Sequence, residues 1–222
     1  MTKDLVAVVT VRKGSQRVKN KNFKPFCGKN LLEYKIKTLK KVKKLDEIII
    51  NTDSDEAIKI AKDYDISFHK REDYYASSEC TNSEFWSHIG EKTDSKFIMF
   101  THCTNPLVKV ETYNKIIDSF NLSKSNNDSI NTVTEVKEFL YLENKPINFN
   151  PSKAPNSQNL REVTKLNFAV NILSTEDMFK RKTLVGRKPI FYKLDDIEGY
   201  DINTNFEFDF AEYLFKKHSF NA

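Results

Sequence analysis

The feature that most constrains the fold of this chain is an alternation of short apolar runs with longer segments of helical periodicity. The runs "LVAVV", "IIIN" and "FIMF" are almost continuously apolar. Continuous apolar runs of this length are typical of strands that are buried on both faces of a parallel sheet. We therefore expect strands over residues 5–10, 47–51, 97–101, 129–136 and 168–173.

The segments between these runs predict helices. A stripe of apolar residues recurs every three or four positions after the first run, at Leu32, Ile36, Leu39, Val42 and Leu45. Ser54 is expected to cap the helix that begins with the acids of "SDEAIKIAKDY". Further helices are expected over residues 84–92, 111–122 and 205–217. A β-α-β-α-β series of this kind predicts an open, mostly parallel α/β sheet with right-handed crossovers and helices on both faces.

Residues 137–166 interrupt this rhythm. "FLYLENK" is compatible with a short hairpin, and "NFNPSKAPNSQNLRE" is rich in Pro, Asn and Ser, as surface loops are. We expect residues 1–222 to form a single domain in which residues 137–166 are a loop or hairpin insertion. The insertion is a candidate for a contact between two copies of the chain.

Length and composition indicate an ordinary globular protein. The 222 residues fit one domain, and no window approaches the roughly 18 consecutive apolar residues of a membrane span. The segment "MTKDLVAVV" lacks the features of a signal peptide, so we expect a cytoplasmic protein without a membrane partner. The three cysteines are far apart and form no C-x-x-C pair, which argues against a disulfide framework or a zinc site.

Positive charge is concentrated near the beginning of the sequence. Residues 1–44 hold 14 Lys and Arg against Asp4 and Glu33, a balance of +12, so the rest of the chain must carry −7 to give the net charge of +5. This asymmetry favours a local anion site over a protein that is basic throughout.

The stretch "TVRKGSQRVKNKN", residues 10–22, follows the first predicted strand and holds five Lys or Arg. Ligands of open α/β sheets bind beyond the carboxyl ends of the strands, where this loop should lie. Gly14 permits close approach of the backbone to a phosphate, and Arg12, Arg17 and Lys21 would add positive charge. The stretch matches neither the P-loop nor the G-x-G-x-x-G motif. On charge and position alone, a phosphate site and a solvated basic loop both remain open.

Beyond these patterns, "VVTVRKGSQRVKNKNFKPFCGKNLLEYKI" resembles the first signature of the acylneuraminate cytidylyltransferases. That signature is an apolar strand followed by R-x-G-S-x-R, K-N and K-P-x-x-G-K-x-L-[LI]-x-Y-x-I. The similarity continues in "IIINTDSDEAIKIAKDY", "HKREDYYASSECTNSEF", "FIMFTHCTNPLVK", "LNFAVNIL" and "YDINTNFEFDFAEYLF". It spans nearly the whole chain and is weakest between residues 137 and 160.

The resemblance implies a Rossmann-like nucleotidyltransferase fold and transfer of CMP from CTP to the hydroxyl group of a sugar acid, with Mg²⁺ and release of pyrophosphate. It implies catalytic roles for Arg12, Lys21 and Asp201. The implied nucleotide-binding residues are Arg12, Gly14, Ser15, Arg17, Lys21, Asn22, Arg71 and Asn82. The implied acceptor-binding residues are His102, Thr104, Asn105, Gln158, Asn167 and Phe168. Asp201 and Asn203 are the implied metal ligands, and a homodimer is expected by analogy.

Several implied roles have structural alternatives. Arg71 could instead form a surface ion pair with Glu72 or Asp73, and His102 could be a structural residue at a strand end. Asp201 could belong to a helix cap, although Asn203 or Thr204 could cap that helix and leave Asp201 free for a metal.

The sequence departs from the family pattern mainly in the motifs near the acceptor. Asn203 stands where the family has a second metal-binding aspartate, His102 where it has Gln, and Phe168 where it has Gly. These changes predict an acceptor other than ordinary N-acetylneuraminate. 3-Deoxy-manno-octulosonate, a phosphorylated compound or another small acceptor remains an alternative, as does a degenerate homologue that only binds nucleotide.

The lysines of "KTLKKVKK" predict the solvent-exposed face of an amphipathic helix and not a nucleic-acid site.

Overall fold

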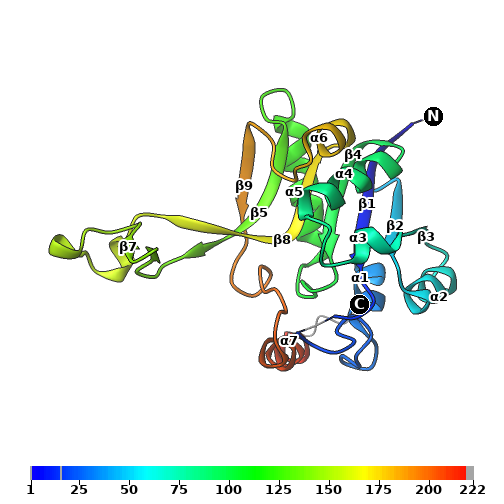
Figure 1. The fold of residues 1–222 in the computed structure, drawn as a ribbon, viewed down its shortest axis with the longest axis horizontal. Coiled ribbons are helices and arrows are strands. Elements are labelled where there is room, and N and C mark those ends of the chain that lie inside the picture. Colours follow the sequence, from blue (N-terminus) through cyan, green and yellow to red (C-terminus); the bar gives the residue numbers. More distant parts are fainter. Residues whose placement is uncertain (1, 16, 219–222) are drawn as a thin grey trace.

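Seven strands form one sheet with helices on both faces in the computed structural model, which describes residues 2–15 and 17–218 (Figure 1). The strand order is β3-β2-β1-β4-β8-β5-β9. The strands are β1 Lys3–Val11, β2 Glu47–Thr52, β3 Ser67–Lys70, β4 Ser95–His102, β5 Ser129–Val136, β8 Val163–Ser174 and β9 Pro189–Lys193. All neighbours pair in parallel except β8, which is antiparallel to both β4 and β5. The prediction of a mostly parallel open α/β sheet is therefore confirmed.

Both faces of the sheet are buried, and alternate residues of β1 serve the two sides. Val9 and its odd-numbered neighbours in β1 pack against one set of helices, whereas Val6 and Val8 face another. The first set is α1 Leu31–Leu39, α2 Asp55–Asp63, α5 Val110–Ser123 and α7 Asn205–Lys217. The second set is α4 Asn82–Lys92 and α6 Thr175–Arg181, and the short α3 Asp73–Ala76 precedes α4. This two-sided burial explains why the strands read as continuous apolar runs.

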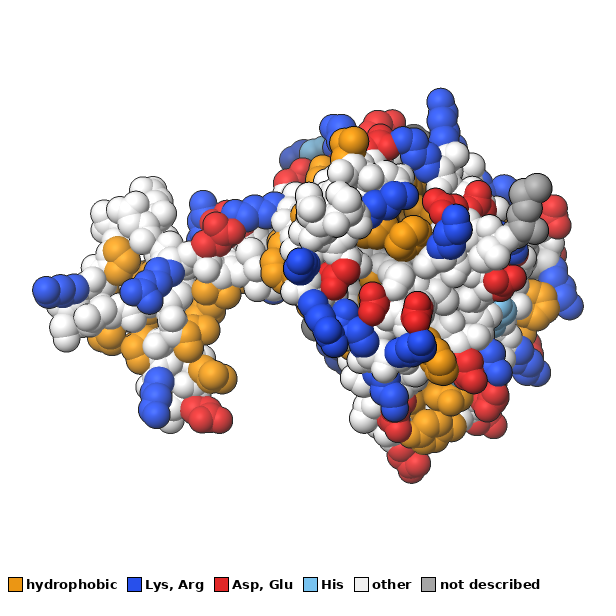
Figure 2. Space-filling model, turned by 90° about the horizontal axis from the view of Figure 1, so that it is seen from above, with side chains coloured by type: hydrophobic (Ala, Val, Ile, Leu, Met, Phe, Trp, Pro, Cys, Tyr) orange, Lys and Arg blue, Asp and Glu red, His pale blue; other side chains and the backbone are white. Residues whose placement is uncertain are grey.

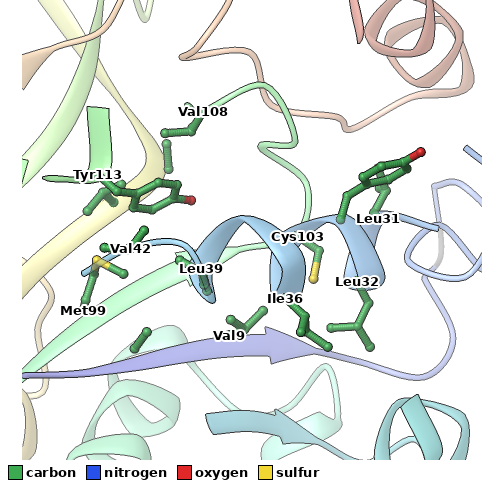
Figure 3. Packing of buried hydrophobic residues seen from close by; sticks show 14 of the residues in the cluster. Val9, Leu31, Leu32, Ile36, Leu39, Val42, Met99, Cys103, Val108 and Tyr113 are labelled. Carbon is green, nitrogen blue, oxygen red and sulfur yellow. The ribbon is translucent and has the colours of Figure 1, made fainter. Parts of the chain in front are cut away.

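Helix α1 is shorter than its apolar stripe suggests. Asn30 caps it by accepting the amide of Glu33, and Ile36 and Leu39 point toward Val9 of β1 (Figure 3). The helix ends at Leu39, so the expected continuation through residue 45 is wrong. Val42 is still buried, because the chain after the helix turns back over the same core.

The predicted starts of α2 and α7 are confirmed. Ser54 caps α2 by accepting the amide of Ala57, and Thr204 caps α7 in a reciprocal capping box with Glu207. Strands β3 and β9 and helix α6 were not predicted. Both strands lie at the edges of the sheet and are only partly buried, which weakens the apolar pattern that would reveal them.

The segment after β5 projects from the sheet as an extension (Figure 1). β5 and β8 continue as an antiparallel pair to Val136 and Val163, and residues 137–162 form the far part of this arm. This part contains the hairpin of β6 Tyr141–Leu142 and β7 Lys145–Pro146, and the single turns η1 Pro151–Lys153 and η2 Ser157–Asn159. Hydrophobic side chains lie on its surface (Figure 2), among them Phe139, Tyr141, Leu142 and Ile147.

Helix α7 packs on the loop that follows β1. The ring of Phe26 contacts those of Phe208 and Phe215 at centroid distances of 5.4 and 5.2 Å. The amide of Cys27 donates to Glu212 Oε1 at 2.9 Å. None of the described helices is long and apolar enough to cross a membrane.

Candidate functional site

A cavity of about 450 Å³ lies where β1 and β4 end, at the carboxyl edge of the parallel strands. This is the edge at which open α/β sheets bind ligands. The cavity draws on the loop after β1, on Arg71 beyond β3, on α3 and α4, and on the end of β4. Its lining residues are Thr10, Arg12, Ser15, Arg17, Lys21, Asn22, Arg71, Tyr75, Ser77, Cys80, Asn82, Phe85, His102, Cys103 and Thr104.

The loop after β1 turns at Gly14, between the lining residues Arg12 and Ser15. Gly14 has a φ of 77°, in the left-handed region that favours glycine, and an added Cβ there would meet nothing within 4 Å. The amide of Lys13 donates to Asp53 Oδ1 at 2.8 Å, so that donor is already engaged. Gly14 does not itself line the cavity, and its contribution is the turn that brings Ser15 and Arg17 to the cavity wall.

Seven of the eight predicted nucleotide-binding residues line this cavity, although they come from segments far apart in the sequence. Four of them are Lys or Arg, and none of the described lining residues is acidic. Lys21 is buried and donates its Nζ to the carbonyl of Ile202. Burial lowers the pKa of Lys21, although the nearby carboxylate of Asp201 opposes the shift. The cavity is therefore suited to an anionic ligand.

Arg71 is fixed in the wall of the cavity. It is 5% exposed, and its Nε and Nη2 donate to the side-chain and backbone oxygens of Asn51 at 2.7 and 2.8 Å. Its guanidinium lies 4.3 Å from the ring centroid of Phe85. Burial lowers the pKa of Arg71 to about 10. The alternative of a surface ion pair with Glu72 or Asp73 is wrong, because the side chain is buried.

A second cavity of about 380 Å³ is lined by residues of β5, β8, α7 and the segment before α7: Thr134, Lys165, Leu166, Asn167, Asp196, Gly199, Tyr200, Asp201, Asn203 and Glu207. The two cavities lie near each other. The charge of Asp201 in the second cavity acts on Lys21 and His102, which line the first. A basic cavity and one with several carboxylates therefore lie next to each other.

Asp201 and Asn203 lie side by side, as their predicted metal role requires. Asn203 Nδ2 donates to Asp201 Oδ2 at 2.8 Å, and the amide of Asn203 donates to Glu207 Oε2 at 2.7 Å. Among the described residues no group of three or more His, Cys, Asp or Glu side chains could hold a metal. Mg²⁺ is often bound by one or two protein oxygens together with substrate phosphates and water. The pair fits a Mg²⁺ ion that arrives with a phosphate ligand better than it fits a preformed metal centre.

The predicted acceptor-binding residues are only partly brought together. His102 and Thr104 line the first cavity, Asn167 lines the second, and the ring of Phe168 stacks on His102 at a centroid distance of 5.9 Å. Phe168 has a φ of 57°, a left-handed conformation at the position where the family pattern has glycine. Desolvation lowers the pKa of His102 to about 4, with Asp201 opposing the shift.

Three acceptor candidates line neither cavity, namely Phe168, Asn105 and Gln158. Asn105 is fully buried, and its Nδ2 donates to the carbonyls of Asn167 and Tyr200 at 3.2 and 3.3 Å. Its side chain therefore joins two backbone segments and does not face a ligand. Gln158 is exposed in η2 of the extension.

A network of buried hydrogen bonds connects α1 to the segments that carry the acceptor candidates. Lys35 Nζ donates to the carbonyl of Asn105 at 2.9 Å and to the hydroxyl of Tyr113 at 2.6 Å. The Tyr113 hydroxyl contacts Thr101 Oγ1 at 3.2 Å, and Thr101 donates to the carbonyl of Ala169 at 2.6 Å. This chain connects α1 to the turn after β4 and to β8, next to His102 and Phe168.

Besides Thr10 and Cys103, the sequence pattern did not reveal four further lining residues, which are Tyr75, Ser77, Cys80 and Phe85. They lie between or beside Arg71 and Asn82, which were predicted. The signal that could have found them is this proximity along the chain.

Comparison with known protein families identifies one family whose profile matches most of the chain. The profile of a family described as "Cytidylyltransferase" matches residues 6–220. The chain is 23% identical over 232 residues to the post-translational flagellin modification protein B of Campylobacter coli, covering 99% of this chain and 98% of that protein. It is also 23% identical over 232 residues to an N-acylneuraminate cytidylyltransferase of Escherichia coli, covering 95% of this chain and 52% of that protein.

A solved structure confirms the fold. The chain is similar to a CMP:2-keto-3-deoxy-manno-octonic acid synthetase complexed with CTP, with a TM-score of 0.73 and 10% sequence identity. The similarity covers 97% of this chain and 100% of that one. The Rossmann-like nucleotidyltransferase fold expected from the sequence is therefore the fold observed.

Proposed function

Because the chain belongs to the cytidylyltransferase family, and is therefore a nucleotidyltransferase, we propose that it transfers CMP from CTP to the hydroxyl group of a sugar acid. The observation that supports this proposal most strongly is the first cavity. Arg12, Arg17, Lys21 and Arg71 surround it without an acidic lining residue among those described. Four positive charges match the charge of a nucleoside triphosphate, and arginine can bind phosphate through two parallel hydrogen bonds.

In this proposal the acceptor hydroxyl oxygen attacks the α-phosphorus of CTP. The new P–O bond forms as the bond to the β-phosphate breaks, pyrophosphate leaves, and the hydroxyl proton is released. Such a displacement depends on positioning and on charge stabilisation, with no covalent intermediate on the protein. Arg12 and Lys21 stabilise the charge on the phosphates, while Ser15, Asn22, Arg71 and Asn82 hold the nucleotide.

Asp201 and Asn203 would hold Mg²⁺ together with the triphosphate. When bound, the ion neutralises phosphate charge and assists departure of pyrophosphate. Asn203 also serves the protein itself, because its backbone amide binds Glu207 and its side-chain amide orients the Asp201 carboxylate. The family resemblance suggests two aspartates here, so we expect this chain to need more Mg²⁺ than a relative that has both.

The acceptor binds where the two cavities approach each other. His102 and Thr104 contact it from β4 and its turn, Asn167 of β8 lines the second cavity, and Phe168 positions the His102 ring by stacking on it. Desolvation keeps His102 neutral, so that its imidazole can donate one hydrogen bond and accept another. An N-acylneuraminate substrate is named for one relative and an octonic acid for the similar structure, which supports a sugar acid as the class of acceptor.

We also propose that residues 1–222 act as a single nucleotidyltransferase domain, and that the extension joins two copies into a homodimer. Phe139, Tyr141, Leu142 and Ile147 are between 44 and 64% exposed on the extension. A cluster of this kind on a projecting arm is costly to leave in water. Light scattering of the wild type and of Leu142→Glu should give a dimer and a monomer, and a monomeric wild type would contradict this proposal.

Pyrophosphate release with CTP, Mg²⁺ and a panel of acidic sugars tests the function. We expect turnover with at least one sugar acid, and a large loss of turnover in Lys21→Met. Lys19→Met is the matched control, because Lys19 is an exposed cation of the same loop that does not line the cavity. Binding of CTP without turnover on any acceptor would refute transfer to sugar acids. Failure to bind CTP would refute the nucleotide site.

A further inference from the structure

The first cavity has two chemically different sides. The loop after β1 contributes cations and small polar groups, whereas α3 and α4 contribute the aromatic side chains of Tyr75 and Phe85. A nucleotide has the same division, because its phosphates are anionic and its base is a flat π-system. The cationic side suits the phosphates, and the aromatic side suits the base.

The two aromatic rings are not equally available. The guanidinium of Arg71 lies 4.3 Å from the Phe85 ring centroid and is held there by its two hydrogen bonds to Asn51. The face of Phe85 is thus already used by a side chain of the protein. Tyr75 is half-buried and lines the cavity, so its ring is open to a ligand.

The Tyr75 ring is backed by a second ring. It stacks on His88 of α4 with the centroids 3.7 Å apart and the planes 17° apart. His88 is 5% exposed, and burial lowers its pKa, which favours the neutral imidazole. The rings of Tyr74 and Tyr75 also contact each other in a T-shaped arrangement, at a centroid distance of 5.3 Å. These contacts fix the ring before any ligand binds, so little side-chain freedom remains to be lost on binding.

We propose that Tyr75 is a nucleobase-binding residue, on which the pyrimidine ring of CTP stacks. This inference rests on the proposed function, because it assumes that the cavity holds a cytidine nucleotide. Stacking of a base on an aromatic side chain depends on the π-face and not on a hydroxyl group. The proposal therefore separates Tyr75 from Arg12, Arg17 and Lys21 of the loop after β1, which act on the phosphates.

Calorimetric titration of three ligands distinguishes these contributions. CTP and CMP contain the base, and inorganic tripolyphosphate contains only the phosphate chain. In Tyr75→Ala we expect the affinities for CTP and CMP to fall about tenfold and that for tripolyphosphate to stay unchanged. Tyr75→Phe should bind all three like the wild type. The matched control is Tyr213→Ala, because Tyr213 is a tyrosine of α7 that is 54% exposed and does not line the cavity.

Other outcomes would overturn the inference. Wild-type affinity of Tyr75→Ala for CMP would exclude base stacking. An equal loss for CMP and tripolyphosphate would assign Tyr75 a structural role in shaping the cavity. If Tyr75→Ala does not fold, Tyr75→Leu keeps an apolar side chain over His88 and removes the π-face, with the same expected results. A wild type that binds tripolyphosphate but neither cytidine nucleotide would overturn the proposed function, and this inference with it.

Discussion

Replacement of Glu207 should destabilise the protein by an amount that depends on pH. Glu207 Oε2 accepts hydrogen bonds from the amides of Asn203 and Thr204, both at 2.7 Å, and from the Thr204 hydroxyl at 3.1 Å. It thus completes the cap of α7 and holds the segment that carries Asp201. Glu207→Ala removes all three bonds, whereas Glu207→Gln keeps an acceptor and loses the charge.

The size of the effect follows from these contacts. Loss of a helix cap costs about 1 kcal/mol, and a hydrogen bond to a charged acceptor is about twice as strong as a neutral one. Glu207 is half-buried, so water replaces part of what is lost. We expect about 2 kcal/mol for Glu207→Ala and about 1 kcal/mol for Glu207→Gln. For a chain of this length, 2 kcal/mol lowers the melting temperature by about 4 to 8 °C.

The pH dependence has a definite sign. Burial raises the pKa of Glu207, but the hydrogen bonds from Asn203 and Thr204 and the charge of Lys21 outweigh it and leave the pKa lowered. A carboxyl group with a lowered pKa in the folded state stabilises the protein above its unfolded pKa of about 4.3, and this contribution is lost as the pH falls through the folded value. The difference in unfolding free energy between wild type and Glu207→Gln should therefore be largest near pH 7 and should decrease below about pH 4.

Urea denaturation at several pH values measures both quantities. Glu56→Gln is the matched control, because Glu56 is exposed in the first turn of α2, where Ser54 makes the cap bond instead. Its effect should stay within about 0.5 kcal/mol. The reasoning is refuted if Glu207→Ala destabilises no more than this control. It is also refuted if the difference in unfolding free energy between wild type and Glu207→Gln is the same at pH 7 and at pH 3.

Four further predictions concern the cavities and their support. Arg71→Met should weaken CTP binding at least tenfold in calorimetry, because it removes a fixed cation from the wall. Asp201→Asn should lower kcat about a hundredfold or more in a pyrophosphate-release assay, whereas Asn203→Asp should lower the Mg²⁺ concentration needed for half-maximal rate. Lys35→Met should cost about 2 to 3 kcal/mol in urea denaturation, because Asn105 and Tyr113 lose a charged donor. His102→Gln should keep at least a third of the activity, since the pKa of about 4 leaves a neutral hydrogen-bonding group at pH 7.

The inner strands and the basic lining of the first cavity could be predicted because their physical signals are local. A strand buried on both faces must be apolar throughout, and a phosphate loop after β1 must combine glycine with cations. The edge strands β3 and β9 carry no such signal, because water covers part of each. The sequence also gave no sign that α1 would end at Leu39, since Val42 returns to the same core from a turn.

The acceptor side was harder to predict, because side-chain direction depends on tertiary packing. Thr104 and Asn105 are adjacent, yet Thr104 faces the cavity and Asn105 points inward to the carbonyls of Asn167 and Tyr200. Tyr75 shows the same difficulty. From the sequence, an aromatic residue in a short helix is as compatible with core packing as with a ligand site. Only the structure shows that the Tyr75 ring stacks on His88 and lines the first cavity.

The packing of α7 on the loop after β1 has a consequence for synthesis of the protein. Lys21 binds the carbonyl of Ile202, and Cys27 binds Glu212, so segments more than 180 residues apart complete the site together. At about 5 to 20 residues per second, roughly 10 to 40 s separate their appearance from the ribosome. A nascent chain that has not reached Ile202 carries the basic loop without the carbonyl that holds Lys21. We therefore expect activity only after Glu212 has been synthesised, and the loop spends that interval as an exposed cationic segment among the anionic RNA of the ribosome.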